Sequence, residues 1–317
     1  MHKPLYCDNK LLELDLHEKT YIVTGASSGI GFETAKQLVK QGATVIMACR
    51  NLDSAKKCME SIRKKYPNAK IEVKYLELGD IKKIHDFVDD LKNTHNVLHG
   101  LINNAGLMNT PFKKTINGYE LQFGVNYLGH FLLTELLIDI LKKSAPSRIV
   151  CVSSCAHDMA EGRIGNIFFD DINYEKRKYD GWEAYAQSKL ANLLHAKSLA
   201  KRLYKTGISA VSVHPGWVHT KLLRSTSILR WRDNIFRPLL NYAGMLQPWE
   251  GIQTTLHALL DEEVPLHTGS YYSQTGFYRN KQCNQGGWPL ESPNPIAQDE
   301  KIAEKLLILS RDLVGLT

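Results

Sequence analysis

Tyr185 and Lys189, four residues apart in a helical pattern, are the side chains best suited to proton transfer. Residues four positions apart on a helix lie on the same face. A phenol has a pKa of about 10, and a nearby ammonium group favours the phenolate and lowers that pKa. A tyrosine tuned in this way can give or take a proton at a carbonyl or alcohol oxygen. The spacing also arises by chance, as an exposed tyrosine beside a surface lysine.

A glycine-rich segment, Thr24–Gly31, is the second chemical signal, with glycines at positions 25, 29 and 31. It follows an apolar run and opens a helical pattern. Glycines permit a tight turn, and the helix N-terminus offers unpaired N–H groups to a pyrophosphate. A Walker loop is excluded because no Gly-Lys-Ser/Thr follows. The context favours dinucleotide binding over a purely structural turn.

The end of the next apolar run indicates which dinucleotide binds. An acidic residue there would bind the ribose 2′-hydroxyl, whereas an arginine accommodates a 2′-phosphate. The run ends in Cys49-Arg50-Asn51, without an acid. We therefore predict NADP(H) rather than NAD(H). In the alternative, Arg50 is a solvated loop residue and Asp53 binds the ribose, but Asp53 should already lie in the following helix.

Short apolar strands alternate with helical patterns along the chain and must position these residues. The predicted strands cover 21–24, 43–48, 71–76, 97–102, 148–153 and 208–213, and the predicted helices 30–39, 52–65, 81–91, 118–143, 182–203, 248–260 and 296–313. Such alternation is typical of βαβ units, and continuously apolar strands are buried on both faces. We predict an α/β fold, a Rossmann-type doubly wound parallel sheet with helices on both faces.

Neither an internal repeat nor a linker divides the chain, so we predict a single domain over 1–317, with an N-terminal extension at 1–18 and a C-terminal tail at 286–317. Of its 317 residues, 43% are hydrophobic and 23% charged, as expected of a globular protein with a sizeable core. The longest apolar run, 131–141, is too short and polar to span a bilayer. The first residues lack a signal-peptide core, so we expect a cytoplasmic protein.

The net charge of +7 is spread along the chain, which argues against nucleic-acid binding. The six cysteines form no Cys-x-x-Cys pair, so we expect reduced and mostly buried thiols. With no His-Glu-x-x-His motif either, we expect no metal site.

Together, these motifs resemble the short-chain dehydrogenase/reductase family. The motifs, in the family's order, are Thr24–Gly31, Asn103–Gly106 (NNAG), Asn126, Ser153-Ser154, Tyr185-xxx-Lys189 and Pro215–Thr220 (PGxVxT). The resemblance covers residues 18–275. Segments such as VNYLGHFLLT and YAQSKLANLL are most similar to the branch of the retinol dehydrogenases and WW-domain oxidoreductases, here without a WW domain.

The resemblance implies a role for each catalytic candidate. Tyr185 would be the acid/base, and Lys189 would bind the nicotinamide ribose and lower the pKa of Tyr185. Ser154, rather than Ser153, would hold the substrate oxygen. Asn126 would complete a proton relay through water.

The implied cofactor-binding set follows the same motifs. It comprises Gly25, Ser27, Ser28, Gly29, Ile30, Gly31, Arg50, Asn51, Glu77, Leu78, Asn103, Ala105, Gly106, Tyr185, Lys189, Pro215, Gly216, Val218 and Thr220. Asn103 and Ala105 would line the adenosine ribose, and Pro215, Val218 and Thr220 would hold the nicotinamide amide. Glu77 replaces the family's usual aspartate near the adenine.

Two further segments bear on the substrate. Residues 220–247 fall where the family has its substrate lid, and their apolar side chains favour a lipophilic substrate such as a steroid, a retinoid or a long-chain aldehyde. Plain packing is our second interpretation, and peripheral contact of 221–246 with an intracellular membrane is the third. The long insertion at 158–179 is either a substrate wall or a surface loop.

We therefore predict an NADP(H)-dependent oxidoreductase that interconverts a carbonyl and a hydroxyl on a lipophilic small molecule. The alternative is a catalytically weak, cofactor-bound scaffold or signalling protein. Such a protein has no physical need for all four catalytic candidates, and all four are present. A sugar-nucleotide epimerase would carry another glycine spacing, and a methyltransferase gives no reason for the Tyr–Lys pair. We also expect a homodimer, because most oligomers are symmetric and the long helices of the family often pair into dimers.

Overall fold

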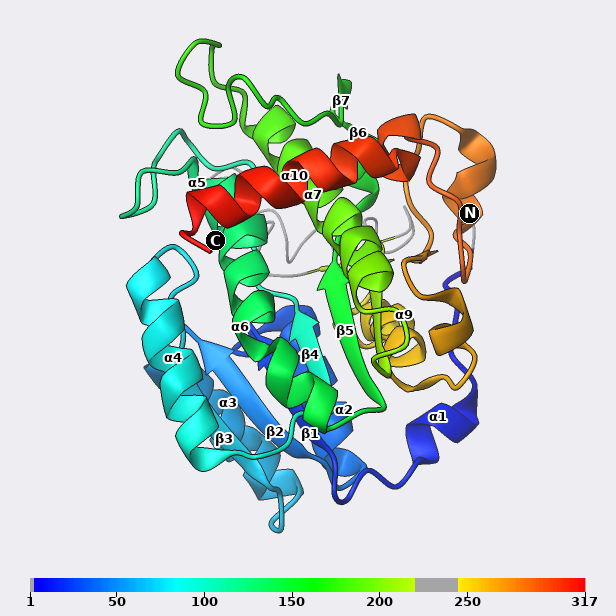
Figure 1. Ribbon diagram of the computed structural model, residues 1–317. Coiled ribbons are helices and arrows are strands. Elements are labelled where there is room, and N and C mark those ends of the chain that lie inside the picture. The colour runs from blue at the N-terminus through cyan, green and yellow to red at the C-terminus, as the bar shows by residue number, and fades with distance from the viewer. Residues whose placement is uncertain (1–2, 220–244, 317) are drawn as a thin grey trace, which may run out of the picture.

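The computed structural model describes residues 3–219 and 245–316, which form three layers, with a sheet between two sets of helices (Figure 1). The sheet has seven strands in the order β3-β2-β1-β4-β5-β8-β9, and every pairing in it is parallel. Its strands are β1 (Thr20–Thr24), β2 (Thr44–Cys49), β3 (Ile71–Tyr75), β4 (Gly100–Asn103), β5 (Ser147–Val152), β8 (Ile208–His214) and β9 (Tyr271–Ser273). The predicted doubly wound parallel sheet is confirmed.

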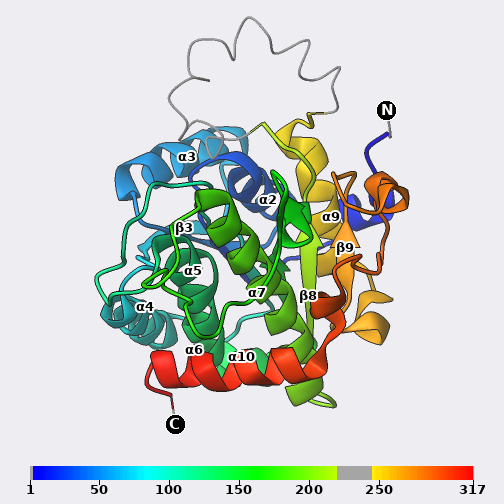
Figure 2. The same ribbon diagram turned by 90° about the horizontal axis from the view of Figure 1, so that it is seen from above.

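Helices cover both faces of this sheet (Figure 2). One face carries α4 (Ile81–Thr94), α6 (Gly129–Lys143) and α7 (Gly181–Arg202), and the other α2 (Gly29–Lys40), α3 (Leu52–Lys65) and α9 (Pro248–Leu260). Consecutive strand residues enter opposite cores: Ile22 packs with the first set of helices, and Val23 with the second. This two-sided burial is why the strands are uniformly apolar rather than alternating.

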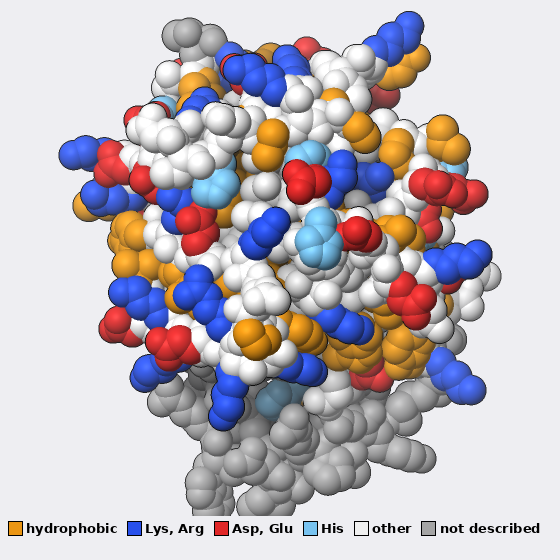
Figure 3. Space-filling view, turned by 90° about the horizontal axis from the view of Figure 1, so that it is seen from below, with side chains coloured by type: hydrophobic (Ala, Val, Ile, Leu, Met, Phe, Trp, Pro, Cys, Tyr) orange, Lys and Arg blue, Asp and Glu red, His pale blue; other side chains and the backbone are white. Residues whose placement is uncertain are grey.

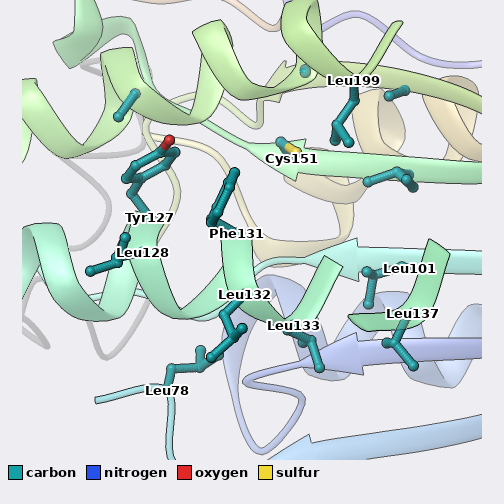
Figure 4. Packing of buried hydrophobic residues seen from close by; sticks show 14 of the residues in the cluster. Leu78, Leu101, Tyr127, Leu128, Phe131, Leu132, Leu133, Leu137, Cys151 and Leu199 are labelled. Atoms are coloured by element: carbon teal, nitrogen blue, oxygen red, sulfur yellow. The ribbon is translucent and has the colours of Figure 1, made fainter. Parts of the chain in front are cut away.

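The helix predicted over 118–143 is interrupted near its start. It consists of α5 (Leu121–Phe123), a π-helical turn η1 (Gly124–Leu128) and α6. In Figure 4, Tyr127 and Phe131 point toward α7 and β5, while Leu132 lies near Leu78. By length and composition, the stretch 121–143 could cross a membrane, but most of it is buried here, as in the core helix of a soluble fold.

Several elements were not predicted from the sequence. They are α1 (Asn9–Glu13), the edge strand β9, a hairpin of β6 (Met159–Ala160) and β7 (Arg163–Ile164), and the 3-10 turns η2 (Cys155–His157), η4 (Val264–His267) and η5 (Lys281–Gln285). The start of the helix predicted over 296–313 is instead a separate 3-10 turn, η6 (Pro295–Gln298). Two- and three-residue strands are too short to show a hydrophobic period.

Both ends of the described chain pack on the domain. The predicted tail helix is present as α10 (Glu300–Leu313), which lies across α6 and α7 (Figure 1). The hydroxyl groups of Tyr127 and of Ser310, on the buried side of α10, are hydrogen-bonded at 2.7 Å. At the other end, the backbone N–H of Leu5 donates to the side chain of Gln274 at 2.9 Å.

Charged side chains on the face seen from below mix both signs (Figure 3). Lysines and arginines there are interspersed with aspartates and glutamates, without a basic stripe. On this face, the distribution agrees with the prediction that the positive charge is not concentrated.

Candidate active site

A cavity of about 870 Å³ opens at the carboxyl ends of the strands, beside the point between β1 and β4 where the order of the sheet reverses. This is where open α/β sheets bind their ligands. Of the predicted site residues, its lining contains Gly25, Ser27, Ser28, Gly29, Ile30, Gly31, Arg50, Asn51, Glu77, Leu78, Ala105, Gly106, Ser154, Tyr185, Lys189, Pro215, Gly216 and Val218. Asn103 and Asn126 do not line it, and Thr220 lies outside the described residues.

The glycine loop is shaped so that its backbone faces the cavity. Gly25 and Gly29 have φ of +68° and +57°, a region that side chains disfavour. A Cβ on Gly31 would lie 2.5 Å from Asn104 Nδ2 and 2.7 Å from Gly25 O. Ser28 is the N-cap of α2 but makes no side-chain cap hydrogen bond, so the first N–H groups of α2 remain available to an anion.

Asn104 and Thr24 hold this loop against β4, a contribution that the sequence analysis missed. Asn104 Nδ2 donates to Thr24 O at 2.7 Å, and Thr24 Oγ1 accepts from the backbone N–H groups of Asn104 and Ala105 at 2.8 and 2.9 Å. Thr24 Oγ1 also lies 2.9 Å from His130 Nε2. The one sequence signal for Asn104 was its place directly after Asn103 in the NNAG motif.

Asn103 corrects the prediction that it lines the adenosine ribose. Its side chain is buried, and Nδ2 donates to Thr134 Oγ1 on α6 at 2.9 Å. Successive strand residues point to opposite faces, so at the end of β4 Asn103 enters the core while Asn104 reaches the cavity. Within the NNAG motif, Asn104, Ala105 and Gly106 line the cavity and Asn103 does not.

The end of the cavity beside β2 and β3 contains Arg50 and Glu77 together. Arg50 Nε lies 3.7 Å from Glu77 Oε2, and the Arg50 side chain is 66% exposed. Asn51 Oδ1 accepts from Ser54 N at 2.8 Å and caps α3, which places Asp53 in the first turn of that helix, as expected. Asp53 does not line the cavity.

Tyr185 and Lys189 lie on one face of α7, as predicted, and both are buried. Lys189 Nζ lies 5.7 Å from the centre of the Tyr185 ring and donates to Val152 O at 2.9 Å. Burial lowers the pKa of Lys189 to about 8. Burial also raises the pKa of Tyr185, and a hydrogen bond with Ser154 opposes that rise only in part. The pKa of Tyr185 therefore lies above its usual value in this structure, because desolvation outweighs the hydrogen bond with Ser154.

The two serines at the end of β5 have different partners. Ser153 Oγ donates to the backbone oxygen of Lys189 at 2.7 Å and ties β5 to α7. Ser154 Oγ accepts from Ala156 N at 3.2 Å and reaches Tyr185. The proximity of Ser154 to the phenol favours it over Ser153 as the substrate-binding serine.

Asn126 occupies the π-helical turn and acts on the backbone behind the cavity. Its Oδ1 accepts from Leu107 N at 2.7 Å, and its Nδ2 donates to Leu107 O at 2.9 Å and Ser188 Oγ at 3.0 Å. Its backbone oxygen accepts from His130 Nδ1 at 3.0 Å. Asn126 thus fixes the turn after Gly106, and the water relay stays a prediction.

One wall of the cavity is apolar and adjoins Tyr185. Its side chains come from β4–α5, η2, the β6–β7 hairpin, α7 and the loops after β8 and β9: Leu107, Met108, Ala156, Met159, Ala160, Trp182, Trp217 and Phe277. Trp182 stands edge-on to Tyr185, with ring centres 6.4 Å apart. Sequence reasoning missed these residues because they are far apart along the chain.

The insertion at 158–179 reaches the cavity at its start. Met159, Ala160 and Glu161 line the cavity, whereas the remainder does not. That remainder is held by Arg177, whose guanidinium stacks 3.6 Å from the ring centre of Phe168 and pairs with Asp171. Only the stretch Met159–Glu161 thus contributes to the cavity wall.

Most of the predicted lid, 220–244, lies outside the described residues. The residues on either side of this segment are joined by backbone hydrogen bonds. His219 N donates to Leu246 O at 2.9 Å, and Leu246 N donates to Trp217 O at 2.7 Å.

The six cysteines are free thiols, as expected. Within 3–219 and 245–316, no cluster of three His, Cys, Asp or Glu side chains could hold a metal ion.

Comparison with known proteins gives one consistent family. The short chain dehydrogenase family model matches residues 19–164. Mouse retinol dehydrogenase 11 is 42% identical over 303 residues, which cover 96% of this chain and 88% of the relative. The crystal structure of an uncharacterized protein from Mycobacterium paratuberculosis has a TM-score of 0.75 at 31% identity, covering 99% of this chain and 98% of that one. A Shigella flexneri short chain dehydrogenase complexed with NADP shares the fold, with a TM-score of 0.63 at 22% identity over 82% of this chain and 98% of that one.

Proposed function

Because the chain belongs to the short-chain dehydrogenase/reductase family, in its retinol dehydrogenase branch, we propose that it is an NADP(H)-dependent oxidoreductase acting on a lipophilic carbonyl or alcohol. Oxidoreduction of a CH–OH or C=O group comes with the family, whereas the cofactor and the substrate class are our proposal. One observation carries it: a single cavity contains the glycine loop, Arg50, the Tyr185–Lys189 pair and an apolar wall.

The residues present fit a nicotinamide dinucleotide. Gly25 and Gly31 let the loop pack closely against Asn104 and Ala105, because a Cβ at either position would clash there, and the open N–H groups of α2 suit a pyrophosphate. Arg50 suits a 2′-phosphate at the end of β2. Tyr185 and Lys189 would hold the nicotinamide ribose, and Pro215–Val218 its carboxamide. When bound, NADPH supplies the hydride.

Tyr185 supplies the proton that balances the reduction. As the carbonyl carbon gains a hydride, its oxygen takes the proton from the Tyr185 hydroxyl and the product is an alcohol. The raised pKa of Tyr185 keeps the phenol protonated at neutral pH, which is the form that reduction requires. Lys189, with a pKa of about 8, is mostly cationic at pH 7 and favours the phenolate that forms. Ser154 would hold the substrate oxygen.

The substrate class follows from the wall beside Tyr185. Aromatic and thioether side chains such as Trp182, Met108 and Met159 offer no charge to a polar substrate, and they favour an extended apolar one. The relative's name adds retinol, so retinal is the first substrate to test. Peripheral membrane contact through 221–246, a cytoplasmic location and a homodimer remain proposals. In the structure, α10 lies across α6 and α7, so a dimer through these helices would have to accommodate α10.

The test is cofactor oxidation by the purified protein. NADPH and NADH are offered in parallel with retinal, a ketosteroid, an aliphatic aldehyde and a quinone. Tyr185→Phe, which removes only the phenolic oxygen, is the control. We expect turnover with NADPH that Tyr185→Phe abolishes while NADPH still binds. Binding of NADPH without turnover on any carbonyl would instead support the scaffold hypothesis.

A further inference from the structure

Ser154 is held from behind by a buried histidine that does not line the cavity. The ring of His157 is fully buried, and His157 Nδ1 lies 2.6 Å from the backbone oxygen of Ser154. The backbone N–H of His157 donates to the same oxygen at 3.0 Å. The carbonyl group of Ser154 is thus fixed by two donors from one residue, on the side away from the reacting groups.

The hydrogen-bond partners of His157 define its tautomer. A carbonyl oxygen only accepts, so Nδ1 carries the proton. Burial lowers the pKa of His157 to about 4, so at neutral pH the ring is uncharged and Nε2 is an acceptor. Nε2 lies 2.6 Å from Ser292 Oγ, which must therefore donate to it. Asn294 N in turn donates to Ser292 Oγ at 3.2 Å. A directed chain of hydrogen bonds runs from Asn294 through Ser292 and His157 to Ser154.

The C-terminal segment clamps the same stretch at two more points. Asn294 Nδ2 donates to His157 O at 2.7 Å and to Gly165 O at 2.9 Å. Asp158, which is fully buried, pairs with Arg279 through Nε at 2.7 Å. Residues about 120 to 140 positions later in the chain therefore fix the turn that follows Ser154.

Such an arrangement exceeds what helix capping or core filling requires. Leaving any member of a buried polar chain unpaired is costly, so the chain locks one geometry. That geometry ends on the residue whose side chain reaches Tyr185. We propose that His157 and Ser292 are positioning residues for Ser154, which set its backbone so that its hydroxyl meets the substrate oxygen. This inference rests on the proposed oxidoreductase function.

The first experiment reports on Ser154 without turnover. Ser154-Cys155 is the only Ser-Cys pair in the sequence, so labelling with carbonyl-¹³C serine and ¹⁵N cysteine gives one carbonyl–amide NMR peak, that of the Ser154 carbonyl. We expect His157→Phe to move this peak upfield and His157→Asn, which keeps a donor near the Nδ1 position, to restore it in part. Ser292→Ala should move it less, and the matched buried change Ser310→Ala, on the buried face of α10, should leave it in place. A peak that His157→Phe and Ser292→Ala both leave unmoved overturns the proposal.

The second experiment is a double-mutant cycle on kcat. We expect His157→Phe to lower kcat about tenfold with an unchanged Kd for NADPH. In the Ser154→Ala background the same change should cost almost nothing, since it acts through Ser154. Ser292→Ala serves in the same cycle if His157→Phe does not fold. An equal loss in both backgrounds would mean that His157 is merely structural. A wild-type protein without turnover would contradict the proposed function, and the labelled peak would then decide the hydrogen-bond chain alone.

Discussion

Lys189 Nζ lies 5.7 Å from the centre of the Tyr185 ring but donates its hydrogen bond to the backbone oxygen of Val152, 2.9 Å away. The ammonium group is thus held near the phenol by β5 rather than by the phenol itself. Its charge is buried, and burial lowers the pKa of the lysine to about 8, so the position is costly for the fold and useful for chemistry.

We therefore expect Lys189→Met to stabilise the fold while it abolishes turnover. Methionine is close to lysine in volume and carries no charge, and Asn192 Nδ2, which also donates to Val152 O at 3.1 Å, keeps that oxygen paired. We expect the free energy of unfolding at pH 7 to rise by about 1–3 kcal/mol. Urea titration of both proteins measures it.

The pH dependence checks the cause of that gain. Lysine titrates near 10.5 when unfolded, whereas the pKa of Lys189 in the fold is about 8. Between these values the unfolded state binds more protons, so this residue makes wild-type stability rise with pH and its penalty is largest below pH 8. The advantage of Lys189→Met should shrink between pH 7 and pH 10. An advantage independent of pH would assign it to packing instead.

Arg50 is expected to set the choice of cofactor. We expect Arg50→Ala to weaken NADPH binding about 10- to 100-fold, because a charge-assisted contact is lost, and to leave NADH binding almost unchanged. Glu77→Gln, which removes the carboxylate 3.7 Å from Arg50, should tighten NADPH binding. Fluorescence titration with both cofactors measures these changes. Lys56→Ala on α3 removes the same charge from an exposed position and is the control. Equal losses for NADPH and NADH would refute the assignment.

The neighbours Asn103 and Asn104 should respond in opposite ways. Asn104→Ala removes the hydrogen bond from Nδ2 to Thr24 O that holds the glycine loop, so we expect weaker NADPH binding with a small change in stability. Asn103→Ala removes the buried bond to Thr134, so we expect a lower melting temperature with an unchanged Kd for NADPH. Calorimetry and cofactor titration of the two variants decide between them. The reverse pattern would restore Asn103 to the cofactor site.

The fold, and the glycine loop and Arg50 that line one cavity, were predictable because their signals are local. A strand buried on both faces is apolar throughout, and a glycine loop lies between adjacent elements, so short windows reveal both. Arg50 was placed by counting from the end of β2, and Tyr185 with Lys189 by helical spacing.

What the sequence could not predict depends on contacts across the chain or on small backbone shifts. The π-helical turn at Gly124–Leu128 interrupts a helix without changing its apolar pattern, and it turns Asn126 toward Leu107. Asn103 and Asn104 are neighbours whose side chains point to opposite sides of β4, so only Asn104 reaches the cavity. The raised pKa of Tyr185 arises from burial, which spacing alone does not report.

Arg177 tests whether the outer half of the insertion contributes to catalysis. Its guanidinium lies between the rings of Phe168 and Tyr174, with ring centres at 3.6 and 4.4 Å, and it pairs with Asp171 and Glu183. Arg177→Ala removes the stack and both ion pairs together, so we expect the melting temperature to fall by about 3–6 °C. Since the residues of the insertion beyond Glu161 do not line the cavity, kcat and KM should stay within about twofold of wild type, a change of less than 1 kcal/mol. Calorimetry and steady-state kinetics below the melting range measure the two effects.

The control for this prediction is Arg177→Lys, which keeps the charge but not the flat stacking surface and should recover only part of the stability. A large rise in KM without a loss of stability would mean that the outer loop reaches the substrate after all.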